Sequence, residues 1–93
     1  MNTELASFHA YIYGRVQGVF FRSYLAKNAW ELGLVGFVRN LSNGSVEVLA
    51  EGDKQQLEKL IEFMKQGPSA AHVDECKINW SRPVGDYLQF HVF

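Results

Sequence analysis

The sequence predicts an α+β protein with a split βαβ arrangement, in which two helices cover one face of an antiparallel sheet. Two observations favour this class. Apolar residues alternate with polar ones over several short segments, and they recur at helical spacing over two longer segments. The segments follow one another in the order β-α-β-β-α-β, with a further short strand at the end. Because 93 residues suit one hydrophobic core, we expect a single domain over residues 1–93.

The first strand and the first helix are predicted from a change in apolar spacing. Residues 8–16 alternate small or apolar side chains with histidine and tyrosine, which is typical of a strand with one buried face. Residues 22–32 are rich in helix formers and carry apolar residues at helical spacing. Gly33 follows as a left-handed stop, so we expect the helix to end there.

Two short apolar runs, residues 36–41 and 46–51, predict the second and third strands. The pair Asn43-Gly44 lies between them and is a strong signal for a two-residue hairpin turn. In that register Arg39 would pair with Val48 and share a sheet face with apolar residues. A bulge or an early end of the strand near Arg39 would remove this conflict.

The second helix and the last two strands complete the predicted order. Asp53 and Gln56 have the spacing of a capping box, an apolar helical face follows, and a Gly-Pro pair at residues 67–68 ends the helix. Residues 76–80 and 88–92 alternate apolar and polar side chains and predict a fourth strand and a short C-terminal strand. This order is that of the ferredoxin-like fold.

Composition and charge exclude several classes of protein. The net charge of −1 gives no broad basic face for duplex nucleic acid. The lone Cys76 cannot form an internal disulfide, and the three histidines lack the spacing of a zinc site, so we expect a reducing, cytoplasmic setting and no metal. We place Cys76 in the core. The sequence has neither a signal-peptide pattern nor an apolar run of membrane-spanning length, so no membrane partner is expected.

The candidate functional site is GRVQGVFFRS, residues 14–23, which connects the first strand to the first helix. No acidic residue occurs between Leu5 and Trp30, and proline removes no backbone N–H from this connection. Gly18 permits a conformation that turns successive N–H groups inward, and the helix N-terminus opens onto the same space. Arg22 at a helix start is disfavoured by the helix dipole unless an anion is bound. The segment therefore predicts an anion site, and it lacks the Lys-Ser/Thr pair of a Walker-type nucleotide site.

Three segments resemble the acylphosphatase family. GRVQGVFFR (residues 14–22) resembles its signature, GFVRNLSNGSVEV (residues 36–48) its second block, and GPSAAHV (residues 67–73) its connection after the second helix. The resemblance implies hydrolysis of the carboxyl-phosphate anhydride of acyl phosphates to a carboxylate and inorganic phosphate, without a cofactor, a metal or a covalent intermediate. It also implies that Arg22 grips the phosphate and that Asn40 orients the attacking water. The phosphate oxygens would be held mainly by the backbone of Arg15, Val16, Gln17, Gly18, Val19 and Phe20.

Two other functions compete with this hypothesis. Tyr11 and Tyr13 are expected on the helix-free sheet face, where an RRM stacks RNA bases. The acidic second half of the chain and the absence of an aromatic-rich third strand disfavour RNA. A non-catalytic module that binds an anion or a protein is disfavoured because Arg22 and Asn40 are both present.

We therefore expect a monomeric enzyme with no nucleic-acid partner. Its partners would be a small acyl phosphate substrate and inorganic phosphate, which would be both product and inhibitor. A site of this size addresses the phosphate, so these residues predict no particular acyl group.

Overall fold

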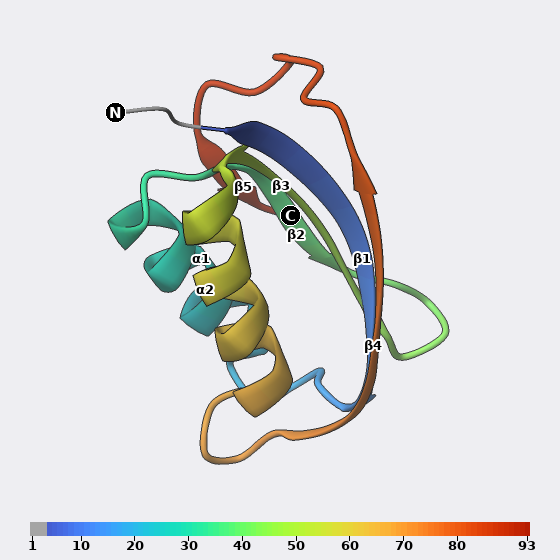
Figure 1. Cartoon of the computed structure of the whole chain (residues 1–93). Helices are drawn as coiled ribbons and strands as arrows, with labels where there is room; N and C mark the ends of the chain where they lie inside the picture. The colour runs from blue at the N-terminus through green and yellow to red at the C-terminus, as the bar shows by residue number, and fades with distance from the viewer. Residues whose placement is uncertain (1–3) are drawn as a thin grey trace.

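The computed structural model describes residues 4–93 and confirms the predicted order of elements (Figure 1). Along the chain these are β1 (Leu5–Arg15), α1 (Phe21–Glu31), β2 (Val35–Asn40), β3 (Val46–Asp53), α2 (Lys54–Gln66), β4 (His72–Ser81) and β5 (Phe90–Val92). Both helices cover the same face of one sheet, as expected.

The sheet has the strand order β4-β1-β3-β2-β5, and its last strand corrects the prediction of an antiparallel sheet. The pairs β1–β3, β1–β4 and β2–β3 are antiparallel, whereas β5 runs parallel to β2 with Gly36 opposite Phe90. The chain leaves β4 at the end of the sheet where β2 begins, and residues 82–89 cross along that end (Figure 1). Since β5 starts from the same end as β2, it has to run in the same direction.

The C-terminal strand is also shorter than predicted, because Leu88 is 91% exposed and lies outside β5.

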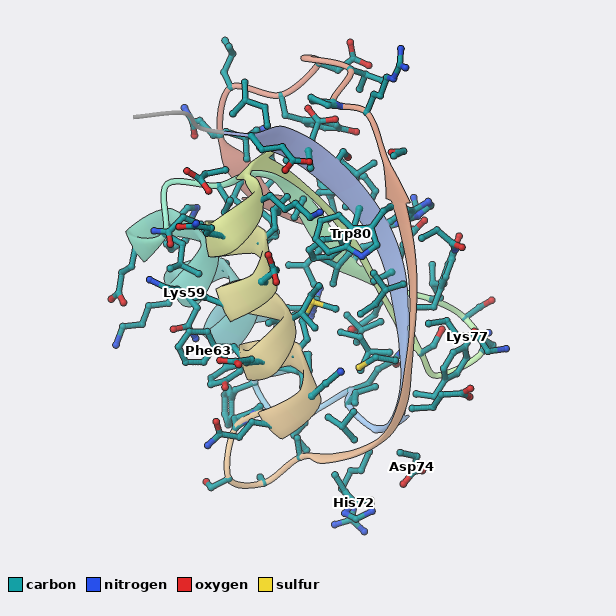
Figure 2. The ribbon with its side chains drawn as sticks, in the orientation of Figure 1. Lys59, Phe63, His72, Asp74, Lys77 and Trp80 are labelled. Carbon is teal, nitrogen blue, oxygen red and sulfur yellow. The ribbon has the colours of Figure 1, made fainter. Side chains whose placement is uncertain are left out.

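The alternation of side chains between the two faces of β4 follows the prediction. Trp80 points from β4 towards the helices, while Lys77 projects from the opposite face (Figure 2). Cys76 packs against the core on the helix side, and burial raises the pKa of its thiol. That shift disfavours the thiolate, which agrees with a structural role.

The β2–β3 connection corrects the predicted two-residue turn. Asn40 pairs with Val46 and Arg39 with Glu47, so the connection is residues 41–45. Asn43 Oδ1 accepts a hydrogen bond from the Ser45 backbone N–H at 3.0 Å and so stabilises the longer turn. This register moves Arg39 to the helix-free face, opposite a carboxylate, and removes the conflict with its apolar neighbours.

The helix ends follow the predicted signals with one correction. Gly33 lies two residues after the end of α1 and has φ of 72°. Gly67 directly follows α2 and has φ of 71°. At the start of α2 the Asp53 side chain accepts a hydrogen bond from the Gln55 N–H at 2.8 Å. The cap is therefore this single bond, and the expected reciprocal bond from Gln56 is not found among residues 4–93.

The hydrophobic core fixes both ends of the segment between β1 and α1. Val16 and Phe21 are each only 1% exposed. They join a core that also contains the fully buried Phe8, Ile12, Leu25, Val48, Leu57, Leu60 and Met64. Burying a large apolar side chain stabilises a fold by about 1.5–3 kcal/mol, so these two anchors hold the intervening loop firmly.

Candidate active site

The loop of residues 15–20 presents unpaired backbone N–H groups between its two anchored ends. No hydrogen bond from the N–H groups of residues 17–20 is found within the described chain. Gly18 (φ 73°) and Phe20 (φ 63°) both adopt the left-handed conformation. A Cβ at Gly18 would meet nothing within 4 Å, so glycine serves the backbone conformation here. The loop has the conformation and the free donors of an anion-binding nest.

Helix α1 adds its N-terminus to the same space. Its N-cap residue, Phe20, makes no side-chain cap hydrogen bond, and no acidic residue lies in the first turn. Ser23 Oγ instead donates to the Phe20 carbonyl at 3.1 Å. The first backbone N–H groups of a helix have no intrahelical partner, and they carry its partial positive charge. This helix end is therefore open to an anion.

Arg22, the second residue of α1, provides the positive charge of the site. Its Nη1 donates to the Phe93 main-chain oxygen at 2.5 Å. No Asp or Glu side chain forms an ion pair with it among residues 4–93. A guanidinium has five N–H donors, so four remain after the bond to Phe93.

Asn40, the last residue of β2, faces the helix side of the sheet. Its Oδ1 atom is buried, and it has no hydrogen-bond partner within the described residues. A buried polar atom without a partner costs about 1–3 kcal/mol, so such atoms are uncommon in stable folds. The amide oxygen can therefore accept a hydrogen bond from a donor that residues 4–93 do not supply.

These parts line one pocket with a volume of about 380 Å³. The lining combines the 15–20 loop, the first turn of α1, the end of β2 and the C-terminal segment, in the residues Val16, Gly18, Phe20, Phe21, Arg22, Ser23, Asn40, Val92 and Phe93. The structure thereby brings Arg22 and Asn40 together, as the sequence predicted. Among the other predicted loop residues, Arg15 is exposed at the end of β1 and Val19 packs against the core.

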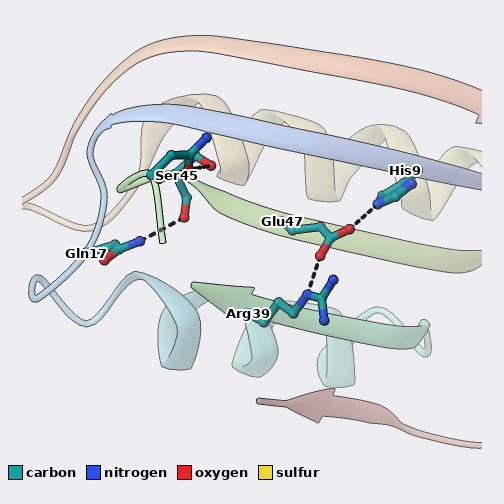
Figure 3. Close-up of polar contacts among 6 residues, drawn as sticks. His9, Gln17, Arg39, Ser45 and Glu47 are labelled. Atoms are coloured by element: carbon teal, nitrogen blue, oxygen red, sulfur yellow. Dashed lines mark hydrogen bonds and ion pairs between the residues drawn. The ribbon is translucent and has the colours of Figure 1, made fainter. Parts of the chain in front are cut away.

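Gln17 makes a contact that the sequence analysis missed. Its Nε2 donates to the Leu41 carbonyl at 2.8 Å and to the Ser45 carbonyl at 2.9 Å, and Figure 3 draws the second bond. The side chain ties the 15–20 loop to the connection that begins directly after Asn40. The family resemblance predicts only a backbone role for Gln17. The one available signal is that Gln17 is the single polar side chain within residues 16–20, and its amide has two N–H donors.

A second polar cluster lies on the helix-free face, outside the pocket. Glu47 accepts from Arg39 Nε and lies with Oε2 2.6 Å from His9 Nε2 (Figure 3). Burial raises the pKa of Glu47, but the hydrogen bonds and charges of His9 and Arg39 outweigh it, so the pKa lies below its ordinary value. Arg39 is therefore paired with the Glu47 carboxylate and does not line the pocket, although it directly precedes Asn40 in the sequence.

Residues 4–93 contain neither a cluster of metal-ligating side chains nor a membrane-spanning helix. No group of three or more His, Cys, Asp or Glu side chains there is arranged to hold a metal ion. None of the helices in this range is long and apolar enough to cross a membrane.

Comparison with known proteins assigns the chain to a family. The acylphosphatase family model matches residues 8–92. The chain belongs to the acylphosphatase family. Hydrolysis of acyl phosphates is the family function, and the corresponding enzyme class is EC 3.6.1.7.

Relatives of the family support the assignment along the whole domain. An acylphosphatase of Thermus thermophilus is 45% identical over 84 residues, which cover 90% of this chain and 94% of the relative. The crystal structure of an acylphosphatase from Bacillus subtilis matches with a TM-score of 0.91 at 32% identity, covering 95% of this chain and 98% of that chain. An acylphosphatase structure from Coxiella burnetii matches with a TM-score of 0.84 at 41% identity, covering 96% and 93%. These neighbours confirm the ferredoxin-like α+β fold.

Proposed function

We propose that acyl phosphate hydrolysis takes place in the pocket between the 15–20 loop and Asn40, with Arg22 and Asn40 as its catalytic residues. One observation carries this proposal: Asn40, whose buried amide oxygen has no partner within residues 4–93, and Arg22, which pairs with no Asp or Glu side chain there, line the same pocket. Each lacks the group that the reaction would bring. The arginine would take the phosphoryl oxygens, and the amide oxygen would take the attacking water.

The phosphoryl group would bind in the nest. The backbone N–H groups of residues 15–20 and of the first turn of α1 would hold its oxygens, and the free donors of Arg22 would take two of them in a bidentate contact. Charge on the equatorial oxygens is what must be stabilised during phosphoryl transfer. Donors that are already fixed by the core need little reorganisation as that charge develops.

Asn40 would position the nucleophile. Its Oδ1 would accept one hydrogen bond from water and turn a lone pair of the water oxygen towards phosphorus. The new P–O bond forms as the bond between phosphorus and the acyl oxygen breaks, and the carboxylate leaves with the electron pair. The proton of the water passes to a phosphate oxygen. Because a carboxylate is a weak base, the leaving group needs no general acid, and this route uses neither a metal nor a covalent intermediate.

We also propose that the protein acts as a monomeric single domain in the cytoplasm, with no nucleic-acid partner. The free thiol of Cys76 and the net charge of −1 support these assignments. Inorganic phosphate, the product, would inhibit competitively because it fits the same nest.

Continuous hydrolysis of acetyl phosphate, with p-nitrophenyl phosphate alongside, tests the proposal. We expect turnover of the anhydride in EDTA, little turnover of the monoester, and in Arg22→Ala a loss of turnover together with weaker phosphate binding, measured by calorimetry. Wild-type phosphate affinity in Arg22→Ala would contradict the assigned site. A phosphate-dependent thermal shift without any turnover would instead identify a non-catalytic binding module.

A further inference from the structure

The C-terminal strand β5 and the residue after it contribute to the pocket at the point where Arg22 lies. Val92 and Phe93 line the pocket, and the Phe93 main-chain oxygen accepts a hydrogen bond from Arg22 Nη1 at 2.5 Å. An arginine side chain has many rotamers, so contacts of this kind decide which one it adopts. The direction in which Arg22 presents its remaining donors therefore depends on where residues 90–93 lie.

β5 is a short edge strand, so few contacts fix its position along the sheet. It has three residues, lies at the end of the strand order and pairs with β2. The Gln89 carbonyl accepts a hydrogen bond from β2 at 2.9 Å, and the Phe93 N–H donates one to β2 at 3.0 Å. Because alternate residues of a strand point their main-chain groups to the same side, those of Phe90 point away from β2. The Phe90 carbonyl thus belongs to the open edge of the sheet, where an acceptor needs a partner from another element.

Trp30, in the last turn of α1, supplies that partner. Its indole Nε1–H donates to the Phe90 carbonyl oxygen at 2.9 Å. An indole has one donor and no acceptor, so this bond uses its whole hydrogen-bonding capacity. Trp30 is 58% exposed, and burial in the core therefore does not account for its position. What Trp30 provides is a bond from the end of α1 to the start of β5.

Helix α1 and the C-terminal segment are therefore joined at two places. Trp30 bonds Phe90 at one of them. Arg22 bonds Phe93 at the other, so the two elements run in opposite directions. The bonding residues of the helix are eight apart, a rise of about 12 Å, and those of the strand are three apart, a span of about 10 Å. Because the two lengths nearly match, both bonds form in a single register, and a shift of β5 by one residue, about 3.3 Å, would break both.

We propose that Trp30 is a positioning residue for Arg22: its indole fixes the register of β5 against α1, and β5 in turn fixes the guanidinium that receives the phosphoryl group. This inference rests on the proposed role of Arg22 in the same pocket. Trp30 lies at the opposite end of α1 from Arg22 and acts only through the strand. Without the indole donor the strand can move, and the donors of Arg22 no longer meet the phosphoryl oxygens in one fixed arrangement.

The test compares Trp30→Phe, which removes the donor and keeps an aromatic ring, with Trp80→Phe. A bond can transmit no more free energy than it contributes itself. Its loss should therefore weaken the binding of inorganic phosphate, measured by calorimetry, about fivefold, the equivalent of one neutral hydrogen bond. The kcat/KM for acetyl phosphate should fall by a similar factor. Trp80 lies on β4 with its ring centroid 5.6 Å from that of Phe8, so Trp80→Phe makes the same change away from β5 and should leave both quantities unchanged.

Amide hydrogen exchange distinguishes positioning from a general loss of stability. The Phe93 N–H, which is bonded to the Val38 carbonyl, should exchange faster in Trp30→Phe, while the amides of β1 and β3 keep their wild-type rates. Wild-type phosphate affinity in Trp30→Phe would overturn the inference even if exchange at Phe93 became faster, because Trp30 would then only hold the strand. Weaker phosphate binding with unchanged exchange at Phe93 would also overturn it.

The same measurements separate this inference from the proposed function. A wild type that binds phosphate but hydrolyses no acetyl phosphate would contradict the proposed function alone, since calorimetry would still show the effect of Trp30→Phe. Wild-type affinity in Trp30→Phe, together with weaker binding in Arg22→Ala, would overturn the role of Trp30 alone. A wild type that binds no phosphate would contradict the site itself and this inference with it.

Discussion

Gln17 should hold Asn40 in place through the β2–β3 connection, and its replacement by alanine tests this. The substitution removes two hydrogen bonds, to the carbonyl oxygens of Leu41 and Ser45 at 2.8 and 2.9 Å. At about 1 kcal/mol each, less some compensation by water, the loss is about 1.5 kcal/mol. For a domain of this size that lowers Tm by about 6–12 °C. The loop and Asn40 would then lose their fixed separation, which can lower kcat about 10²-fold.

Gln17→Glu makes the same test with almost no change in size. It places a carboxylate against two carbonyl oxygens, so at pH 7 it should be less stable and less active than Gln17→Ala. Lowering the pH towards 5 should restore part of both, because a protonated carboxyl can donate one of the lost bonds. Thermal unfolding by circular dichroism and acetyl phosphate kinetics measure these effects.

A double variant distinguishes positioning from a general loss of stability. If Gln17 acts through Asn40, then Gln17→Ala combined with Asn40→Ala should lose less activity than the product of the two single losses. Strict multiplicativity, or wild-type kcat/KM in both Gln17 variants, would refute this reasoning.

Three further predictions concern other parts of the molecule. Glu47→Gln should lower the free energy of unfolding by about 1 kcal/mol at pH 7, since its partners His9 and Arg39 are partly exposed. Because the folded-state pKa of Glu47 lies below its ordinary value of 4.5, this contribution is complete above that pH and should vanish as the pH falls through the folded-state pKa, as urea titrations at several pH values would detect. Cys76→Ser should retain wild-type kcat/KM while losing about 1 kcal/mol in urea unfolding, because a hydroxyl replaces a partly buried thiol; inactivity with an intact fold would indicate a thiol mechanism. Exhaustive EDTA treatment should leave turnover unchanged, and activity that returns only on adding a divalent ion would contradict the metal-free route.

The sequence predicts those features that depend on neighbouring residues. Apolar spacing and helix stops are local, so they lead to five strands and two helices in the correct order and to the placement of Arg22 at the start of α1. The position of Asn40 beside Arg22 then follows from that order and from the family resemblance. Local signals are less reliable where distant groups compete with them. Asn43-Gly44 favours a tight turn, yet Gln17 bonds the carbonyls of a longer one.

Other features depend on contacts that no local pattern encodes. The direction of β5 results from where residues 82–89 cross the sheet, and its pairing joins Gly36 to Phe90, far apart in the chain. The pairing of Arg39 with Glu47 depends on the length of a connection that the Asn-Gly signal misjudged. The left-handed backbone of Phe20 and the 83% exposure of its side chain likewise follow from the folded structure, and the apolar residue type by itself predicts neither.

The central claim, that Asn40 positions water while Arg22 holds the phosphoryl group, is tested most directly by measuring kcat and the inhibition constant of inorganic phosphate in Asn40→Ala. We predict a fall in kcat of at least about 10²-fold with an unchanged inhibition constant, whereas Arg22→Ala should impair both. Thermal stability should not fall, because the variant removes a buried oxygen that has no partner within residues 4–93. A loss of phosphate affinity in Asn40→Ala as large as that in Arg22→Ala, or near wild-type kcat in Asn40→Asp at neutral pH, would contradict the claim.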